Sequence, residues 1–152
     1  MSRLSCQQVD VSIATVEVAR QLNLSIAKGE FWGLLGPNGI GKTTLLNCLA
    51  GLTTPNTGHA EVFGERVDPA TPEYRSDVGY VGEESGFFQR WTAGRNLEYL
   101  AQSVPTWSTD RARRLAERFA LPLDKAVSKL SRGNRTKLAL VAALAHGPRL
   151  LL

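Results

Sequence analysis

A glycine-rich segment between two apolar runs constrains the fold of this chain more than any other feature. The segment reads Gly-Pro-Asn-Gly-Ile-Gly-Lys-Thr-Thr over residues 36–44 and follows the apolar run of residues 31–35. A second, mainly apolar run, residues 45–49, comes directly after it. This order predicts a strand, a glycine loop and a helix, which together form a phosphate-binding P-loop.

The residue types of this loop suit phosphate binding. Its glycines let the backbone turn tightly, so that consecutive N–H groups meet the β-phosphate, and the helix beginning near Lys42 adds the positive end of its dipole. The Lys42 ammonium can reach the β- and γ-phosphates, and the Thr43 hydroxyl is placed to ligate the Mg²⁺ that bridges them. The predicted nucleotide-binding residues are Gly36, Pro37, Asn38, Gly39, Ile40, Gly41, Lys42, Thr43 and Thr44.

Composition limits the class of protein. The 152 residues are 43% hydrophobic, which fits one ordinary globular domain with a core of its own. Two cysteines, Cys6 and Cys48, are too few for a disulfide framework and favour a reduced, cytoplasmic protein. The longest apolar stretch, residues 138–145, is far shorter than the roughly 20 residues that cross a bilayer, and no signal-peptide pattern is present. We therefore expect a chain that neither spans a membrane nor is exported.

Hydrophobic periodicity predicts strands before the loop and mostly helices after it. Apolar residues alternate with polar ones in three stretches before the loop, and this predicts three half-buried strands, at 9–13, 14–18 and 22–26. Further strands are expected at 60–63 and 77–82, and helices at 96–102, from Ser108 or Thr109 to Pro122, and at 135–145. The pattern indicates an α/β fold that opens with antiparallel strands.

A second informative segment, Leu-Ser-Arg-Gly-Asn, stands before the last predicted helix. By itself, a serine at this place is equally well explained as a helix N-cap. It comes after the P-loop with a helical segment between them, however, and in this order the chain resembles the ATP-binding domains of ABC transporters. Their signature, LSGGQ, is kept here at its first, second and fourth places. The corresponding residues are Leu130, Ser131, Arg132, Gly133 and Asn134.

The resemblance covers essentially the whole chain and implies a fold. It implies a P-loop NTPase core with an N-terminal antiparallel β-subdomain and an inserted helical subdomain. A single domain over residues 1–152 would divide into a core of residues 1–82 and 131–152 and a helical subdomain of residues 83–130.

The catalytic acids of the family lie beyond the last predicted helix. ABC domains continue through an apolar strand into a Mg²⁺-binding Asp, a catalytic Glu and later a His, whereas this sequence stops at Leu152. Neither His59 nor His146 takes the place of that His, and both are expected to be structural or solvated. We therefore expect a truncated domain with an incomplete central sheet, no catalytic residue within the chain and hydrolysis close to absent.

The resemblance further implies partners. In the family, two ATP-binding domains meet head to tail, so that each ATP lies between one P-loop and the signature of the other domain. Residues 131–134 would then meet the γ-phosphate of the ATP bound by a second copy or a paralogue. Closure of this dimer would move an attached membrane permease. The implied location is cytoplasmic and peripheral, on the inner face of the cell membrane.

Two places depart from the family pattern. Glu83 occupies the place where the family usually has a Gln, and because a carboxylate can ligate Mg²⁺ we expect Glu83 as a metal ligand beside Thr43, with a solvated loop acid as the alternative. This acid, the Trp107 segment and the charged signature resemble exporter subfamilies. The family also commonly stacks adenine on an aromatic residue upstream of the loop. The first aromatic residue here is Phe31, so the preference for adenine comes from the resemblance alone.

The charge distribution supports a competing function. Of the 18 Lys and Arg residues, 10 lie between Arg111 and Arg149, against two acids. Such a basic third of a chain fits an ABC-type ATPase head acting on nucleic acid, in DNA repair or chromosome organisation. Those proteins would need coiled-coil or zinc insertions, which the sequence lacks. A solvated helical face explains the charge more simply, so no nucleic-acid partner is expected. A non-hydrolysing nucleotide-binding fragment is a further alternative.

Overall fold

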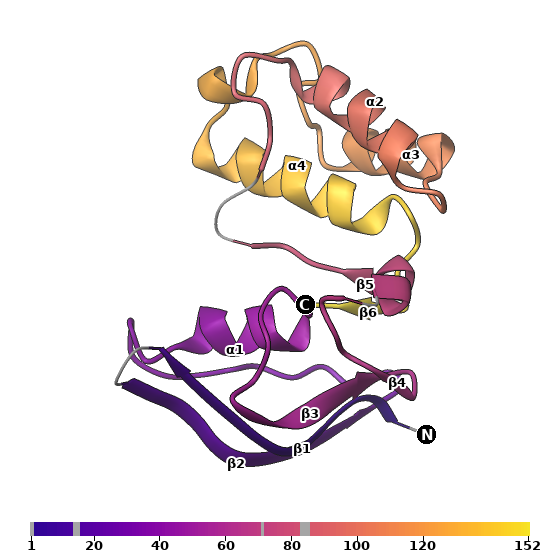
Figure 1. Cartoon of the computed structure of the whole chain (residues 1–152). Coiled ribbons are helices and arrows are strands. Elements are labelled where there is room, and N and C mark those ends of the chain that lie inside the picture. The colour runs from indigo at the N-terminus through magenta and orange to yellow at the C-terminus, as the bar shows by residue number, and fades with distance from the viewer. Residues whose placement is uncertain (1, 14–15, 71, 83–85) are drawn as a thin grey trace. The chain divides into compact units, whose positions relative to one another are not determined.

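Residue contacts divide the computed structural model into two units, residues 1–75 and residues 76–152 (Figure 1). The structure describes residues 2–13, 16–70, 72–82 and 86–152.

An antiparallel sheet of four strands, in the order β2-β1-β3-β4, forms the first unit. β1 (Ser2–Ile13) and β2 (Val16–Ala27) make one long hairpin. β1 also pairs with β3 (Thr57–Val62), which pairs with the short β4 (Glu65–Arg66). The antiparallel opening predicted from the alternation of apolar residues is thereby confirmed.

Helix α1 (Lys42–Leu49) lies against β1 and β2, and the core of the first unit is between them (Figure 1). Leu4, Val9 and Val62 of the sheet are fully buried, and Leu45 and Leu49 of the helix are only 8% and 4% exposed. Both cysteines are free and buried here, and burial raises the pKa of the Cys6 thiol to about 11. The thiols are therefore protonated at neutral pH and act as core residues.

The predicted strands 14–18 and 22–26 are not separate, because residues 16–27 form the single strand β2, and residues 14 and 15 lie outside the described residues. Gln21 takes a φ of 45° and Gln8 a φ of 50°, so both strands are kinked where their register shifts. The Asp10 carboxylate accepts hydrogen bonds from the Gln21 N–H and, at 2.7 Å, from the Thr57 hydroxyl. The break in alternation near residue 20 is thus a bulge inside a strand, not a turn.

Residues 31–35, predicted as the strand before the glycine loop, form no strand in the structure. Neither of the sheets found among the described residues includes them. The Phe31 and Leu35 side chains are 98% and 92% exposed. An apolar segment becomes a strand only where a neighbouring strand supplies hydrogen bonds and a packing surface. The segment therefore runs as a loop from the turn at Lys28 and Gly29 to the P-loop.

The second unit combines a short parallel sheet with helices (Figure 1). The 3₁₀ helix η1 (Pro72–Asp77) leads into β5 (Val78–Gly79), which pairs in parallel with β6 (Leu150–Leu151). Helices α2 (Ala93–Ser103), α3 (Thr109–Arg118) and α4 (Arg132–Leu144), with the 3₁₀ helix η2 (Val127–Lys129), surround a core of their own. None of the helices in the described ranges has the length and apolar character needed to cross a membrane.

Side-chain caps set where the three helices of this unit begin. Thr92, Ser108 and Ser131 each accept a hydrogen bond at 3.2 Å from the backbone N–H three residues later. The start of α3 after Ser108 is as predicted. Helix α4 starts three residues earlier than predicted, because the Ser131 cap satisfies the first turn.

Candidate nucleotide-binding site

The glycine-rich segment forms an exposed loop that ends in α1. Gly39 and Gly41 have φ values of 81° and 98°, left-handed conformations that residues with a Cβ rarely adopt. The Ile40 N–H donates to the Pro37 carbonyl at 3.4 Å, and the Leu45 N–H donates to the Gly41 carbonyl at 3.0 Å and begins the helix. The loop and helix start predicted from the sequence are therefore in place, although the strand before them is not.

The Lys42 side chain folds back over this loop. Its Nζ donates hydrogen bonds to the carbonyl oxygens of Gly36 and Pro37, both at 2.8 Å. These bonds keep the ammonium beside the glycine residues predicted to hold phosphate. Charged phosphate oxygens are stronger acceptors than carbonyls, so an anion on the loop can take this donor over.

The N-terminus of α1 offers backbone N–H groups to an anion. The first N–H groups of a helix have no acceptor within it, and the N-cap residue Gly41 has no side chain to supply one. The first turn contains no acidic residue. Together with Lys42, these donors fit a phosphate group.

Two further predicted residues, Thr43 and Thr44, lie in the first turn of α1. Thr43 is exposed and Thr44 half-buried. A hydroxyl oxygen at Thr43 suits Mg²⁺, which prefers oxygen ligands and shares its coordination with phosphates. Glu83, the other predicted metal ligand, lies outside the described residues.

Side chains from other segments hold α1 at both ends. At its start, Val18 of β2 lies against Gly41, where a Cβ would stand 2.4 Å from both Val18 methyl carbons. At its end, Gly51 has a φ of 67°, and a Cβ there would stand 1.5 Å from the Tyr74 hydroxyl oxygen. The Arg75 guanidinium donates to the Gly51 carbonyl at 2.9 Å. No sequence pattern indicates the roles of Val18, Tyr74 and Arg75, because only the folded chain brings them to the helix.

The signature residues lie in the second unit, at the start of α4. The Ser131 hydroxyl caps the helix by accepting from the Asn134 N–H at 3.2 Å, which confirms the N-cap interpretation. Arg132 and Gly133 are exposed, and a Cβ on Gly133 would meet nothing within 4 Å. The first turn holds no acid, and Arg132 is followed by Arg135. Cations at a helix N-terminus add to its positive end, so this turn attracts anions.

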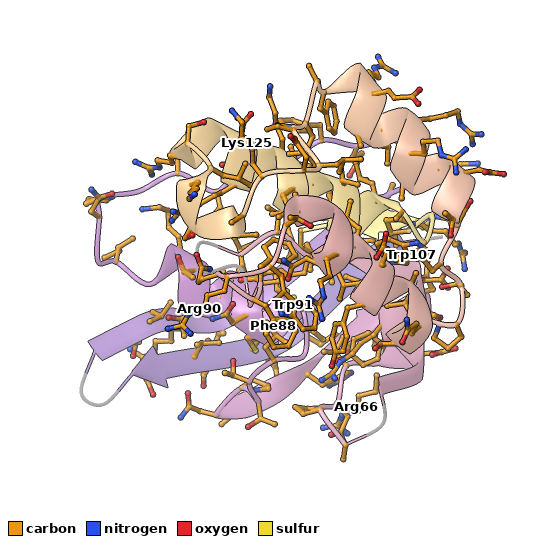
Figure 2. All side chains as sticks on the ribbon, turned by 90° about the horizontal axis from the view of Figure 1, so that it is seen from above. Arg66, Phe88, Arg90, Trp91, Trp107 and Lys125 are labelled. Atoms are coloured by element: carbon orange, nitrogen blue, oxygen red, sulfur yellow. The ribbon has the colours of Figure 1, made fainter. Side chains whose placement is uncertain are left out.

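An aromatic cluster that no sequence motif predicts lies before α2 and includes one residue of that helix (Figure 2). The Phe88 ring centroid lies 4.3 Å from that of Trp91 and 5.3 Å from that of Tyr99. The Arg95 guanidinium lies 4.2 Å from the Trp91 centroid, a cation–π contact. Trp107, singled out in the sequence, packs instead against the helical core.

The two histidines make structural contacts within their own units. His59 Nε2 lies 3.5 Å from a carboxylate oxygen of Glu61 on the same strand. His146, at the end of α4, has its Nε2 3.2 Å from the Val78 carbonyl oxygen of β5. Burial lowers the pKa of His146 and the nearby Arg111 adds to this, while the Val78 contact and Asp77 oppose it. His146 is thus neutral at pH 7 and links α4 to β5.

We expect the folded chain to lose stability as the pH falls below about 6.5, the ordinary pKa of histidine. The pKa of His146 is lower in the folded chain than in the unfolded chain. Between these two pKa values the unfolded chain binds more protons, so the free energy of unfolding decreases as the pH is lowered. Urea unfolding at pH 7.5 and pH 5.5 measures this. His146→Gln keeps a donor toward Val78 but cannot titrate, so it should lose less stability than wild type. Equal losses in both proteins would contradict this assignment.

Known proteins resemble this chain in sequence and in fold. The sequence model of the ABC transporter family matches residues 19–152. The sn-glycerol-3-phosphate import ATP-binding protein UgpC 3 of Rhizobium johnstonii is 33% identical over 153 residues, which cover 97% of this chain and 44% of that protein. The ABC transporter ATP-binding protein NatA of Bacillus subtilis is 34% identical over 143 residues, which cover 90% of this chain and 58% of that protein. The chain spans about half the length of the curated relatives it matches.

A solved structure agrees with the sequence matches. The structure of an ATP-binding subunit of an ABC transporter superposes with a TM-score of 0.83 at 25% identity, and the match covers 99% of this chain and 65% of that one. The chain therefore shares its fold with a protein of that description.

Proposed function

The chain belongs to the ABC transporter family, as an ATP-binding domain, and from this we propose that it binds ATP with Mg²⁺ and couples binding to transport by a separate membrane permease. The observation that carries the proposal is the start of α1, where free N–H groups, a left-handed Gly41 and the Lys42 ammonium converge. A triphosphate is the ligand that uses all of these groups together.

We assign the roles in the loop by the chemistry of each group. The N–H groups of residues 38–44 hold the β-phosphate, and Lys42 pairs with the γ-phosphate after leaving its two carbonyl partners. Thr43 and Glu83 ligate Mg²⁺, which neutralises charge on the phosphates. Isothermal titration with Mg-ATP tests this proposal, and no detectable binding would overturn it.

A second ATP-binding domain, identical or paralogous, completes the proposed site. Its P-loop would place the γ-phosphate at the turn of residues 131–134, where Arg132 and Gly133 are exposed. In this arrangement the core of residues 1–82 and 131–152 carries both contact surfaces, and the helical subdomain of residues 83–130 meets the permease. The proposed location is the cytoplasmic face of the cell membrane.

The exporter-like subfamily also belongs to this proposal. It is supported by the acid at Glu83, by the Trp107 segment and by the charged residue Arg132 in the signature. One similar protein is named for the import of sn-glycerol-3-phosphate, so the direction of transport needs its own test. Transport assays with the partner permease in sealed vesicles would decide it.

We expect Gly133→Asp to weaken ATP-dependent dimerisation at least about fivefold while the chain stays folded. The exposed position has room for a side chain, and the negative charge of an Asp in the first turn of α4 stabilises the positive end of the helix. Facing a γ-phosphate, however, the same carboxylate is repelled by about 1 kcal/mol or more at 4 Å, and more strongly where water is excluded. Sedimentation velocity with and without Mg-ATP measures the association.

Gly133→Ser is the matched control for this prediction, because it adds a small side chain without charge. It should dimerise like wild type, and thermal unfolding should show all three proteins equally folded. If Gly133→Asp dimerises as strongly as wild type at the same ATP concentration, the turn of residues 131–134 does not face the γ-phosphate.

A further inference from the structure

Two side chains hold the C-terminal end of α1. The Arg75 guanidinium donates to the Gly51 carbonyl at 2.9 Å, and the Tyr74 hydroxyl donates to the Ala50 carbonyl at 3.5 Å. The last carbonyls of a helix have no donors within it and form the negative end of its dipole. The Tyr74 hydroxyl therefore satisfies the carbonyl of the C-cap residue Ala50, and Arg75, bound to the next carbonyl, places a positive charge beside the negative end of the helix.

The contact between α1 and these side chains is tight. Gly51 ends the helix in a left-handed conformation, with its N–H donating to Cys48 and the Leu52 N–H donating to Asn47. A Cβ on Gly51 would stand 1.5 Å from the Tyr74 hydroxyl oxygen, and Tyr74 is only 3% exposed. Since no space separates the helix end from Tyr74, a displacement of α1 displaces Tyr74 as well.

The position of these residues in the chain gives the contact a further role. Tyr74 and Arg75 are the last residues of the first unit, and η1, which contains them, runs directly into β5. The opposite end of α1 carries Lys42 and the free N–H groups of the proposed phosphate site. An eight-residue helix, about 12 Å long, thus connects the phosphate site to the segment where one unit passes into the next.

We propose that Tyr74 and Arg75 are positioning residues that transmit the occupation of the phosphate site, through α1, to residues 72–79. The inference rests on the proposed function, because it requires a phosphate at the start of α1. A bound triphosphate draws Lys42 from the carbonyls of Gly36 and Pro37 and loads the N-terminus of the helix. The shift reaches Gly51 at the other end, where Arg75 and Tyr74 follow it and tighten η1.

Hydrogen exchange of the full chain, with and without Mg-ATP, tests this inference. In wild type, saturating Mg-ATP should slow exchange in peptides covering residues 72–79 at least threefold. Arg75→Ala should lose this response while its affinity for Mg-ATP stays within about threefold of wild type, because Arg75 does not touch the ligand. Arg75→Lys keeps a cationic donor and should restore the response. Arg66→Ala, which removes an exposed arginine of the same unit (Figure 2), is the matched control and should respond like wild type.

The possible results distinguish a failure of this inference from a failure of the proposed function. An unchanged response in Arg75→Ala, or no response at residues 72–79 in a wild-type chain that binds Mg-ATP, would overturn the inference and leave the proposed function standing. A wild-type chain that does not bind Mg-ATP would overturn the proposed function, and this inference with it. If Arg75→Ala unfolds, Tyr74→Phe, which removes one hydroxyl, takes its place, and a wild-type response there overturns the inference.

Discussion

Replacing Lys42 by alanine is expected to lower the affinity for Mg-ATP about 10- to 100-fold without unfolding the chain. Hydrogen bonds to charged groups contribute about 1.5–3 kcal/mol each, and every 1.4 kcal/mol corresponds to about tenfold in affinity. The Lys42 ammonium is also the cation that lies on the loop, 2.8 Å from the carbonyls of Gly36 and Pro37. Isothermal titration of both proteins with Mg-ATP measures the change.

Lys28→Ala provides the comparison for this variant. Lys28 is an exposed lysine in a turn of the same unit, so its removal changes net charge equally but leaves the loop intact. We expect Lys28→Ala to bind Mg-ATP like wild type. Equal affinities for the Lys42→Ala and wild-type chains would remove Lys42 from its assigned role.

Gly41→Ala is the second variant for which we expect a large effect, a loss of about 2–5 kcal/mol of stability together with loss of nucleotide binding. A left-handed conformation, here with a φ of 98°, costs a residue with a Cβ about 1–2 kcal/mol. The new methyl group would also stand 2.4 Å from the Val18 methyl carbons, and overpacking of this kind costs about 1–3 kcal/mol. Urea unfolding measures the sum.

Gly39→Ala separates these two causes. Gly39 has a φ of 81° but nothing within 4 Å of its Cβ position, so only the conformational part of the cost should remain. Adding Val18→Ala to Gly41→Ala should recover part of the packing cost. If Gly41→Ala and Gly39→Ala are equally stable, the contact between Val18 and Gly41 is looser than described.

The elements that depend on neighbouring residues along the chain were predicted well from the sequence. The start of α1 at Lys42, the Ser108 cap and the α/β order with an antiparallel opening all follow from local motifs and periodicity. The prediction of a strand at residues 31–35 was wrong, because strand formation depends on partner strands that the segment's own sequence does not contain. The count of three strands was wrong because the Gln21 conformation is held by Asp10, which lies on the neighbouring strand.

In the candidate site, too, the parts formed by contiguous residues can be predicted from the sequence, and the contacts between distant residues cannot. The glycine loop and the Ser131 turn are contiguous motifs, so the sequence locates them directly. Arg75 reaches Gly51 from 24 residues away, and no periodicity or spacing indicates that contact. Gly51 gives part of this information. A glycine after a helix predicts a left-handed helix end, but it does not predict which side chain packs against that end.

The Lys42 tether sets a threshold for the ligands that the loop can hold. Two of the three donors of its ammonium already have carbonyl acceptors at 2.8 Å, so a ligand that draws the ammonium away from the loop must replace two hydrogen bonds. A single weakly basic anion, such as chloride, offers too little in exchange. A chain of phosphates offers several charged oxygens at once, to the lysine and to the helix N–H groups together. We therefore expect the loop to favour polyphosphates over simple anions before any base or sugar is recognised, because its own backbone carbonyls compete for the Lys42 ammonium.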